Sequence, residues 1–298
     1  MSEPILERLL RGQGWMESWG DAVQGLVGRI YGTLGPLGRP LKNLAHGTQP
    51  LHHPLHPALT DAPLGAWLVG LALDYAAAAN HSLPHWPGDA ALAAGTLAAL
   101  AAVLTGYTDF HETFGLERRT ALTHGLLMTT VFLLECVSLA IRLWGGSGAH
   151  GLAVVIATIA VLLAALGMYV GGHLVYGFGT MVNRNAFAEG NAEEFVAVGK
   201  PADFPEGSLK RVDAAGLPAL VVRTGGKLLA IGAVCSHAGG PLEEGELKDG
   251  TVICPWHGSC FRLSDGTAVT GPATFAEPVF AVREREGQVE LKLERPLH

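Results

Sequence analysis

Two short segments of the chain each pair a cysteine with a histidine: Cys235-Ser236-His237 and, after 16 intervening residues, Cys254-Pro255-Trp256-His257. Each segment carries one thiol and one imidazole, side chains that bind transition metals. Cysteine and histidine together hold both structural zinc ions and certain iron–sulfur clusters. Two such pairs in two short segments therefore predict a metal centre held between two loops.

The residues that follow each pair narrow the choice of metal. Gly239-Gly240-Pro241-Leu242 follows the first pair, and Gly258-Ser259 follows the second. The whole pattern resembles the Rieske motif, C-x-H…C-x-x-H, and the resemblance covers essentially all of residues 195–298. A Cys₂His₂ zinc site is the alternative, but zinc motifs usually space their paired ligands differently. The resemblance implies a [2Fe–2S] cluster, with its two cysteines on one iron and its two histidines on the other. The metal ligands would be Cys235, His237, Cys254 and His257.

Several positions depart from the high-potential members of this family. A disulfide joins the two cluster loops in quinol–cytochrome c reductases, whereas the matching positions here are Gly240 and Trp256. Phe261 replaces a hydrogen-bonding tyrosine, while Ser259 is kept and is expected to donate to a bridging sulfur. Fewer donors stabilise the reduced cluster less, so we expect a potential in the lower half of the Rieske range of about −150 to +300 mV. The pattern resembles the ferredoxin and ring-hydroxylating-oxygenase type, and we expect Cys260 to be a packed, spare thiol.

Composition divides the chain into an apolar and a polar part. Of the 298 residues 49% are hydrophobic, but Ala, Leu, Gly and Val dominate residues 57–180. Four apolar stretches approach the roughly 20 residues that cross about 30 Å of hydrocarbon; they are 57–79, 90–107, 121–143 and 151–174. They predict an all-α bundle of four transmembrane helices within residues 46–182. Buried helices of a soluble protein are the alternative.

The flanking regions have different patterns. Residues 4–31 contain apolar positions at helical spacing with charges between them, which predicts one amphipathic helix within an N-terminal segment at residues 1–45. Residues 183–194 are a short polar linker. Beyond them, Leu220–Thr224 and Lys227–Ile231 flank Gly225-Gly226, which predicts a β-hairpin. We therefore expect a multi-domain membrane protein that ends in an all-β domain at 195–298. No internal repeat stands out beyond the alanine-rich spans.

Positive charges predict the orientation in the membrane. Arg118 and Arg119 fill the second loop and Arg184 follows the fourth span, whereas the loops at 80–89 and 144–150 contain no Lys or Arg. The positive-inside rule places both termini and the β domain in the cytoplasm. The N-terminus has no apolar core of a secretory signal. We expect a multi-pass protein of a bacterial inner membrane.

Residues 40–180 resemble an uncharacterised family of bacterial four-helix membrane domains, which is sometimes fused to Rieske domains. The resemblance rests on His46-Gly47-Thr48 and on the segment from His53 to Asp61. The predicted topology also brings one histidine from each span to the cytoplasmic level; these are His56, His111, His124 and His173.

Ionisable groups at membrane depth usually mark a site, so these four histidines are candidates to bind a b-type haem or a quinone. His124 and His173 are the preferred axial ligands. Anchoring of helices in the headgroup region is the alternative. Asp74 and Glu135 lie deeper and are expected to form a polar pair or a proton path.

The net charge of −7 and the lack of a Lys/Arg cluster argue against a nucleic-acid partner. The leading interpretation is an electron-transfer protein that connects a membrane partner, either quinone or b-type haem, with a cytoplasmic reductase or oxygenase. The alternatives are a quinol- or haem-linked oxidoreductase and a redox sensor with a membrane anchor. A Rieske oxygenase is disfavoured, because no domain with a two-His-one-carboxylate iron site follows. The sequence leaves open a homo-oligomer and the choice between carrier and enzyme.

Overall fold

The structure, a computed structural model, describes residues 4–294 and divides the chain into two compact units. The helical unit comprises Met1–Leu34 and Leu55–Phe178, and the β unit comprises Gly35–Pro54 and Gly179–His298. These divisions differ from the boundaries predicted from sequence at residues 45, 182 and 194, because residues 35–54 and residues 179–194 both join the β unit.

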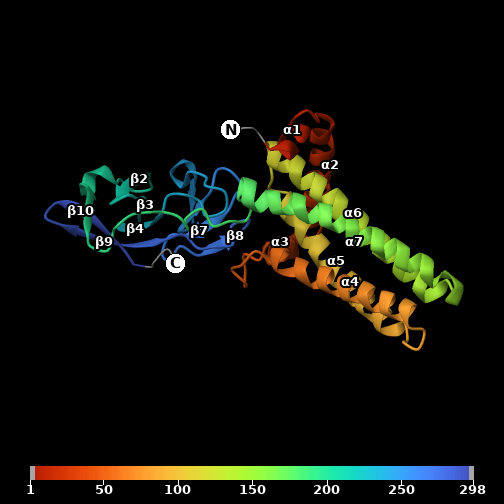
Figure 1. Cartoon of the computed structure of the whole chain (residues 1–298). Helices are drawn as coiled ribbons and strands as arrows, with labels where there is room; N and C mark the ends of the chain where they lie inside the picture. The colour runs from red at the N-terminus through yellow and green to blue at the C-terminus, as the bar shows by residue number, and fades with distance from the viewer. Residues whose placement is uncertain (1–3, 295–298) are drawn as a thin grey trace. The chain divides into compact units, whose positions relative to one another are not determined.

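Four long helices form the main part of the helical unit, as predicted: α4 (Leu55–Ala79), α5 (Trp86–Phe110), α6 (Gly115–Trp144) and α7 (His150–His173), the last continued by a π-helical turn at Leu174–Phe178. Helices α4 and α5 pair as one hairpin and α6 and α7 as another (Figure 1). All four are long and apolar enough to span a membrane. At about 1.5 Å per residue each exceeds the roughly 30 Å of the hydrocarbon core.

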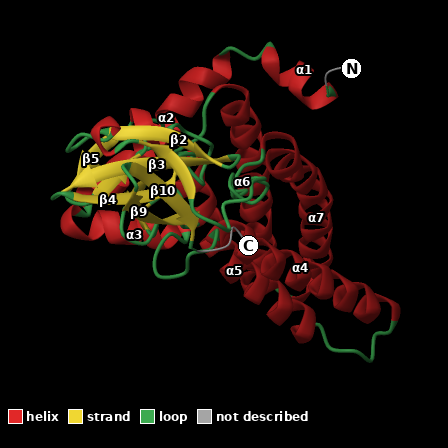
Figure 2. Cartoon of the chain, turned by 90° about the vertical axis from the view of Figure 1, so that its left-hand side faces the viewer, coloured by secondary structure: helices red, strands yellow, loops and turns green. Residues whose placement is uncertain are grey.

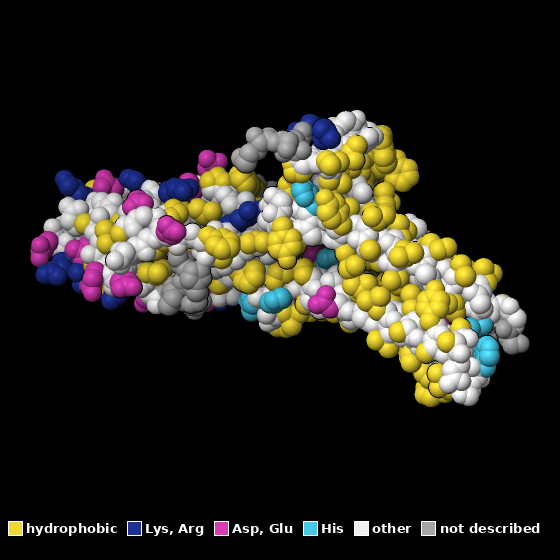
Figure 3. Space-filling view, viewed as in Figure 1, with side chains coloured by type: hydrophobic (Ala, Val, Ile, Leu, Met, Phe, Trp, Pro, Cys, Tyr) yellow, Lys and Arg dark blue, Asp and Glu magenta, His cyan; other side chains and the backbone are white. Residues whose placement is uncertain are grey.

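The burial pattern of these helices indicates that the outer surface of the bundle contacts lipid rather than water. Small side chains fill the contacts between helices, and Ala157, Ala160 and Ala164 are completely buried. Large apolar side chains point outward; Leu97 is 74% exposed and Leu162 is 67% exposed. Hydrophobic side chains accordingly cover the visible surface of the helices (Figure 3). A soluble bundle would bury these leucines, so the soluble alternative is rejected.

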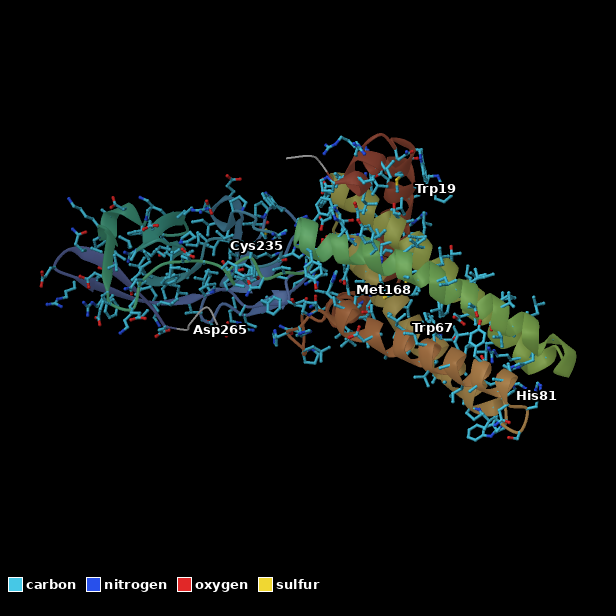
Figure 4. The ribbon with its side chains drawn as sticks, in the orientation of Figure 1. Trp19, Trp67, His81, Met168, Cys235 and Asp265 are labelled. Carbon is cyan, nitrogen blue, oxygen red and sulfur yellow. The ribbon has the colours of Figure 1, made fainter. Side chains whose placement is uncertain are left out.

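The N-terminal segment forms two helices instead of one, α1 (Ile5–Arg11) and α2 (Trp15–Thr33), separated at Gly12-Gln13-Gly14. Arg118 and Arg119 at the start of α6 both bind Glu17 of α2. Trp19, labelled in Figure 4, is more than half exposed. The segment therefore has ion pairs on one face and exposed apolar side chains on the other.

The β unit contains two antiparallel sheets (Figure 2). The six-stranded sheet has the order β1-β10-β9-β4-β3-β2 and the four-stranded sheet the order β5-β6-β7-β8. The strands are β1 (Val196–Gly199), β2 (Leu209–Ala214), β3 (Leu217–Thr224), β4 (Lys227–Gly232), β5 (Glu246–Lys248), β6 (Thr251–Ile253), β7 (Cys260–Arg262), β8 (Ala268–Thr270), β9 (Val279–Arg285) and β10 (Gln288–Leu293). The predicted hairpin at Gly225-Gly226 joins β3 to β4, and both glycines have positive φ.

The segment around α3 (Gly38–His46) belongs to the β unit because it bonds to strand β8 and the turn after it. The Asn43 side chain donates to the carbonyl of Val269 at 3.2 Å and accepts from the N–H of Gly271 at 3.1 Å. His46 and Thr48 are completely buried. Residues 32–63 are rich in Pro, Gly and His, a composition that does not show which unit they join, so the predicted boundary at residue 45 falls inside this segment.

Candidate metal centre

Two loops of the β unit present the predicted ligands, and they share one backbone pattern. In the first ligand loop, residues 235–240, Cys235 N–H donates to the Gly240 carbonyl at 2.9 Å and Gly239 N–H donates to the Cys235 carbonyl at 2.8 Å. In the second ligand loop, residues 254–259, the same bonds join Cys254 to residue 259 at 2.8 Å and residue 258 to Cys254 at 3.1 Å. A glycine with positive φ occupies the fifth position of both loops. Each cysteine is therefore fixed at the base of a closed loop.

The structure brings the four predicted ligands together. Cys235 and Cys254 are 1% and 3% exposed, and one thiol hydrogen-bonds to the other. The rings of His237 and His257 lie 4.9 Å apart, centroid to centroid, nearly perpendicular to each other. Both Nδ1 atoms are buried although the residues are half-exposed. The edge of each ring opposite Nδ1 is therefore the part that is exposed to solvent.

Hydrogen bonds to sulfur prepare the cysteines for a metal. The backbone N–H of His237 bonds to the Cys235 sulfur, and the N–H groups of Trp256 and His257 bond to the Cys254 sulfur. The hydrogen bond from Cys235 lowers the pKa of Cys254, with help from these backbone donors. The same bond raises the pKa of Cys235, because that thiol keeps its proton as the donor. The backbone donors to both sulfur atoms favour thiolates, which are the form that binds iron, so this donor set fits a [2Fe–2S] cluster.

The loops approach each other closely at Gly240. All four cysteines of the chain, Cys136, Cys235, Cys254 and Cys260, are free. The loops are thus held without the disulfide of the high-potential type. The buried Ser259 hydroxyl accepts from the N–H of Ala273 at 3.0 Å, which leaves its own proton to donate.

Two residues that sequence analysis did not select support the first ligand loop. Glu277 is 1% exposed, and its carboxyl accepts from the Ser236 N–H at 2.7 Å and from the Asn185 side chain at 2.8 Å. Asn185 also donates to the carbonyl of Val234 at 3.1 Å. Burial raises the pKa of Glu277 to about 8 despite these bonds. An isolated Glu and an Asn in an expected linker carry no pattern that sequence reasoning recognises.

In the helical unit, the structure pairs His56 with His124, whose ring centroids are 6.2 Å apart. The Nδ1 of His56 lies 2.9 Å from the Ala102 carbonyl, and that of His124 lies 2.8 Å from the Gly167 carbonyl. A carbonyl only accepts, so each ring donates from Nδ1 and keeps Nε2 as a free acceptor in its neutral form.

The other two candidates contact carboxylates instead. His111 Nδ1 lies 2.9 Å from the Glu112 carboxylate, and His173 Nε2 lies 3.1 Å from the Glu7 carboxylate. Asp74 likewise pairs with Arg142 rather than with Glu135.

The two helical hairpins repeat each other in a way that sequence analysis did not detect. Asp74 follows His56 by 18 residues, and Arg142 follows His124 by 18. In each hairpin a glycine stands four residues after the carbonyl that binds the histidine; these are Gly106 and Gly171. A Cβ at either glycine would lie 2.8 Å from the Cε1 of that histidine ring. Both rings thus occupy equivalent, glycine-lined places.

Comparison with known proteins agrees with this architecture. Residues 194–282 match the Rieske [2Fe–2S] domain family, and residues 52–184 match a family described as predicted membrane protein (DUF2231). Ferredoxin CarAc of Metapseudomonas resinovorans is 34% identical over 89 residues, which are 30% of this chain and 83% of that protein. The fold and the ligand loops define a protein with a Rieske iron–sulfur centre. The chain belongs to the Rieske [2Fe–2S] family, with a membrane domain joined to its ferredoxin-like part.

Two further matches concern only the β unit. Apoptosis-inducing factor 3 of Mus musculus is 33% identical over 90 residues, so the chain spans only 15% of that protein's length. A solved complex of reduced oxygenase and oxidized ferredoxin in carbazole 1,9a-dioxygenase contains a chain that is 31% identical. The match covers 36% of this chain and 100% of that one, with a TM-score of 0.33.

Proposed function

We propose that this protein is a membrane-anchored electron carrier that passes single electrons between a redox partner in the bilayer and one in the cytoplasm. The observation that carries the proposal is the convergence of two buried thiols and two half-exposed imidazoles on two matching loops. A bound [2Fe–2S] cluster supplies one-electron chemistry at such a site. The chain holds the sulfur ligands away from water and leaves an imidazole edge as the short route for an electron.

The cytoplasmic partner is proposed to be a reductase or an oxygenase. One relative is a ferredoxin by name, and the solved complex pairs a ferredoxin with an oxygenase. Trp256, which lies beside His257, is 54% exposed and offers an aromatic contact next to the exit route. A bacterial inner membrane with the β unit in the cytoplasm is the location that the arginine distribution supports.

The membrane partner is proposed to be a b-type haem or a quinone at His56 and His124. Metal-bound histidines usually donate their other ring N–H to a carbonyl or carboxylate, and both of these rings do so. A b-type haem, if bound here, would be held by His56 and His124, whose ring centroids are 6.2 Å apart, and would supply one-electron chemistry within the bilayer. The alternative is a quinone site, in which the Nε2 atom of His56 or His124 accepts a hydrogen bond from a quinol hydroxyl.

The cluster assignment is tested by electron paramagnetic resonance of the reduced, detergent-purified protein. His237→Ala, His257→Ala and Cys254→Ser should each abolish the Rieske signal. Cys260→Ser should retain it, because Cys260 lies on β7 outside the ligand loops. A Rieske signal that persists without His237 or His257 would overturn the assignment.

The membrane site is tested by the optical spectrum of the reduced protein and by extraction for quinone. If haem is present, His56→Ala and His124→Ala should both remove its α-band, whereas His173→Ala should not. Loss in His173→Ala with retention in His56→Ala would restore the pairing preferred from sequence. A spectrum with cluster bands alone and no extracted quinone would leave a redox sensor with a membrane anchor as the better function.

A further inference from the structure

A second group of ligating side chains lies at the end of the helical unit where α4 finishes and α5 and α7 begin. One potential ligand atom from each of Asp74, His85 and His150 lies within 4.8 Å of the others. Histidine side chains are visible on the surface at this end of the bundle, near the labelled His81 (Figures 3 and 4). None of the three belongs to the redox sites described above.

Asp74 is held rigidly for a ligand. It is 2% exposed, and Arg142 binds both of its oxygens, at 3.0 Å through Nη1 and at 2.6 Å through Nη2. Arg142 is itself fixed by Asp89 at 2.7 Å and by the Ser138 hydroxyl at 3.3 Å. A bidentate guanidinium leaves lone pairs on the carboxylate oxygens, so this network orients the carboxylate in the way that outer-shell partners orient metal ligands.

His150 provides a buried nitrogen that can bind a metal ion, and His85 provides an exposed one at the surface. His150 Nε2 is buried, lies 3.5 Å from an Asp74 oxygen, and has no hydrogen-bond partner among the described residues. The ring of His85 lies 4.2 Å from that of His150, centroid to centroid. His85 is exposed, so its ring reaches solvent and can rotate. An ion therefore has a path to the buried nitrogen.

The charge balance around Arg142 favours a cation. Asp74, Asp89 and Glu135 surround this single guanidinium closely enough for their charges to interact. Glu135 is completely buried, and neither of its oxygens has a hydrogen-bond partner within the part of the chain that the structure describes. Three carboxyl groups against one guanidinium leave excess negative charge in an apolar bundle, where unpaired charge is costly. Protons or a metal ion must offset it.

The repeat of the hairpins places the histidine pair at equivalent positions. His85 precedes Ala102 by 17 residues, and His150 precedes Gly167 by 17. These carbonyls are the equivalent acceptors of the His56 and His124 rings. Each hairpin thus carries one histidine at the start of its second helix, and the two helices bring these histidines into contact.

We propose that Asp74, His85 and His150 bind one divalent transition-metal ion, with Asp89 and Glu135 balancing its charge. Two imidazoles and one carboxylate form a ligand set found at catalytic zinc sites, which keep a fourth position open. Metal–ligand bonds of about 2.0–2.2 Å require ligand atoms roughly 3.5 Å apart. Rotation of the exposed His85 closes the remaining gap. The ion links α4 to the starts of α5 and α7 and is independent of the cluster.

The test uses the full-length, detergent-purified protein with its iron–sulfur cluster intact, dialysed against a chelator and then titrated with Co²⁺. We expect one Co²⁺ per chain, with the visible absorption of a four-coordinate site that Zn²⁺ then displaces. His85→Ala and His150→Ala should each weaken binding at least tenfold while the Rieske signal stays unchanged. His81→Ala, in the same loop and also exposed, should bind like the wild type.

Three results would overturn the site. One is a wild-type protein that binds no Co²⁺ or Zn²⁺ stoichiometrically, which would mean that protons alone balance the carboxyl groups. Another is equal loss in His81→Ala and His85→Ala. The third is normal binding in both His85→Ala and Asp74→Asn. Because the Rieske signal is recorded on the same samples, failure of this site is distinguishable from failure of the electron-transfer function.

Discussion

Gly240 of the first ligand loop meets Cys254 of the second so closely that a Cβ at Gly240 would lie 2.7 Å from the Cys254 sulfur. The same Cβ would lie 3.2 Å from the Trp256 ring. The absence of a side chain at residue 240 is therefore what allows the two loops to close without a disulfide. Gly240, which stands where the high-potential type has a cysteine, is therefore required for steric reasons at this site.

Gly240→Ala should separate the loops and lower the iron content of the purified protein severalfold. The reason is that the new methyl group overlaps a metal ligand that cannot move without losing its bond. Iron and sulfide analysis together with the Rieske signal measures the effect. Gly250→Ala is a stringent control in the same unit, since it adds the strain of alanine at positive φ, which Gly240→Ala lacks, but its Cβ meets no atom within 4 Å. Full cluster content in Gly240→Ala would show that the two loops can accommodate the added methyl group without losing the cluster.

Glu277→Ala should destabilise the β unit by about 1–3 kcal/mol, because it leaves the buried N–H of Ser236 and the side chain of Asn185 without their acceptor. Glu277→Gln should be milder, since an amide oxygen still accepts one of the two bonds. Thermal unfolding and the rate of cluster loss measure both. Glu284→Ala, which removes an exposed ion pair with Arg223, should change stability by less than about 1 kcal/mol. Equal stability of Glu277→Ala and the wild type would contradict the supporting role.

Phe261→Tyr should raise the midpoint potential. Phe261 is completely buried in the same core cluster as Cys235 and Cys254, and a hydroxyl there adds a donor beside the sulfur atoms. A hydrogen bond stronger by about 1 kcal/mol in the reduced state corresponds to about 40 mV, since 59 mV is tenfold for one electron. Phe261→Leu changes the packing without adding a donor and should shift the potential much less. Redox titration followed by the Rieske signal decides, and equal shifts in the two variants would exclude the hydrogen-bond explanation.

The elements that depend on a local sequence pattern could be predicted from the sequence. The spans follow from runs of apolar residues, and the ligand loops follow from the spacing of Cys235, His237, Cys254 and His257. Contacts between segments that are remote in the chain could not be predicted from the sequence. Asn43 bonds to Val269 of β8 and to Gly271 after it, which lie 226 and 228 positions further along the chain. Asn185 bonds to Glu277, 92 positions away. A single polar side chain has no periodicity, so only the fold reveals its partner.

The hairpin repeat was missed for a different reason. Its equivalent positions hold unlike residues, such as Asp74 and Arg142, which bind each other instead of matching. The equivalence therefore lies in helix geometry and in where backbone carbonyls meet His56 and His124. Alanine and leucine fill most of the remaining positions and give little sequence contrast.

Glu17 joins α2 to α6 through hydrogen bonds from Arg118 and Arg119. Hydrogen bonds from Arg118 and Arg119 lower the pKa of Glu17 below its ordinary value of 4.5. A lowered folded-state pKa contributes stability above pH 4.5, and this contribution is lost as the pH falls through the folded-state value. Amide hydrogen exchange of residues 5–33 should therefore stay slow at neutral pH and accelerate in acid, while exchange in α4 to α7 changes little.

Glu17→Gln should accelerate exchange of residues 5–33 already at neutral pH and remove most of its acid dependence, with the Rieske signal unchanged. Glu3 and Glu7 are unsuitable controls, because Glu3 lies outside the described residues and Glu7 contacts His173. Asp21→Asn is the matched control, since Asp21 binds Arg118 alone and is far more exposed than Glu17. An acid response that persists in Glu17→Gln and disappears in Asp21→Asn would assign the attachment to Asp21 instead.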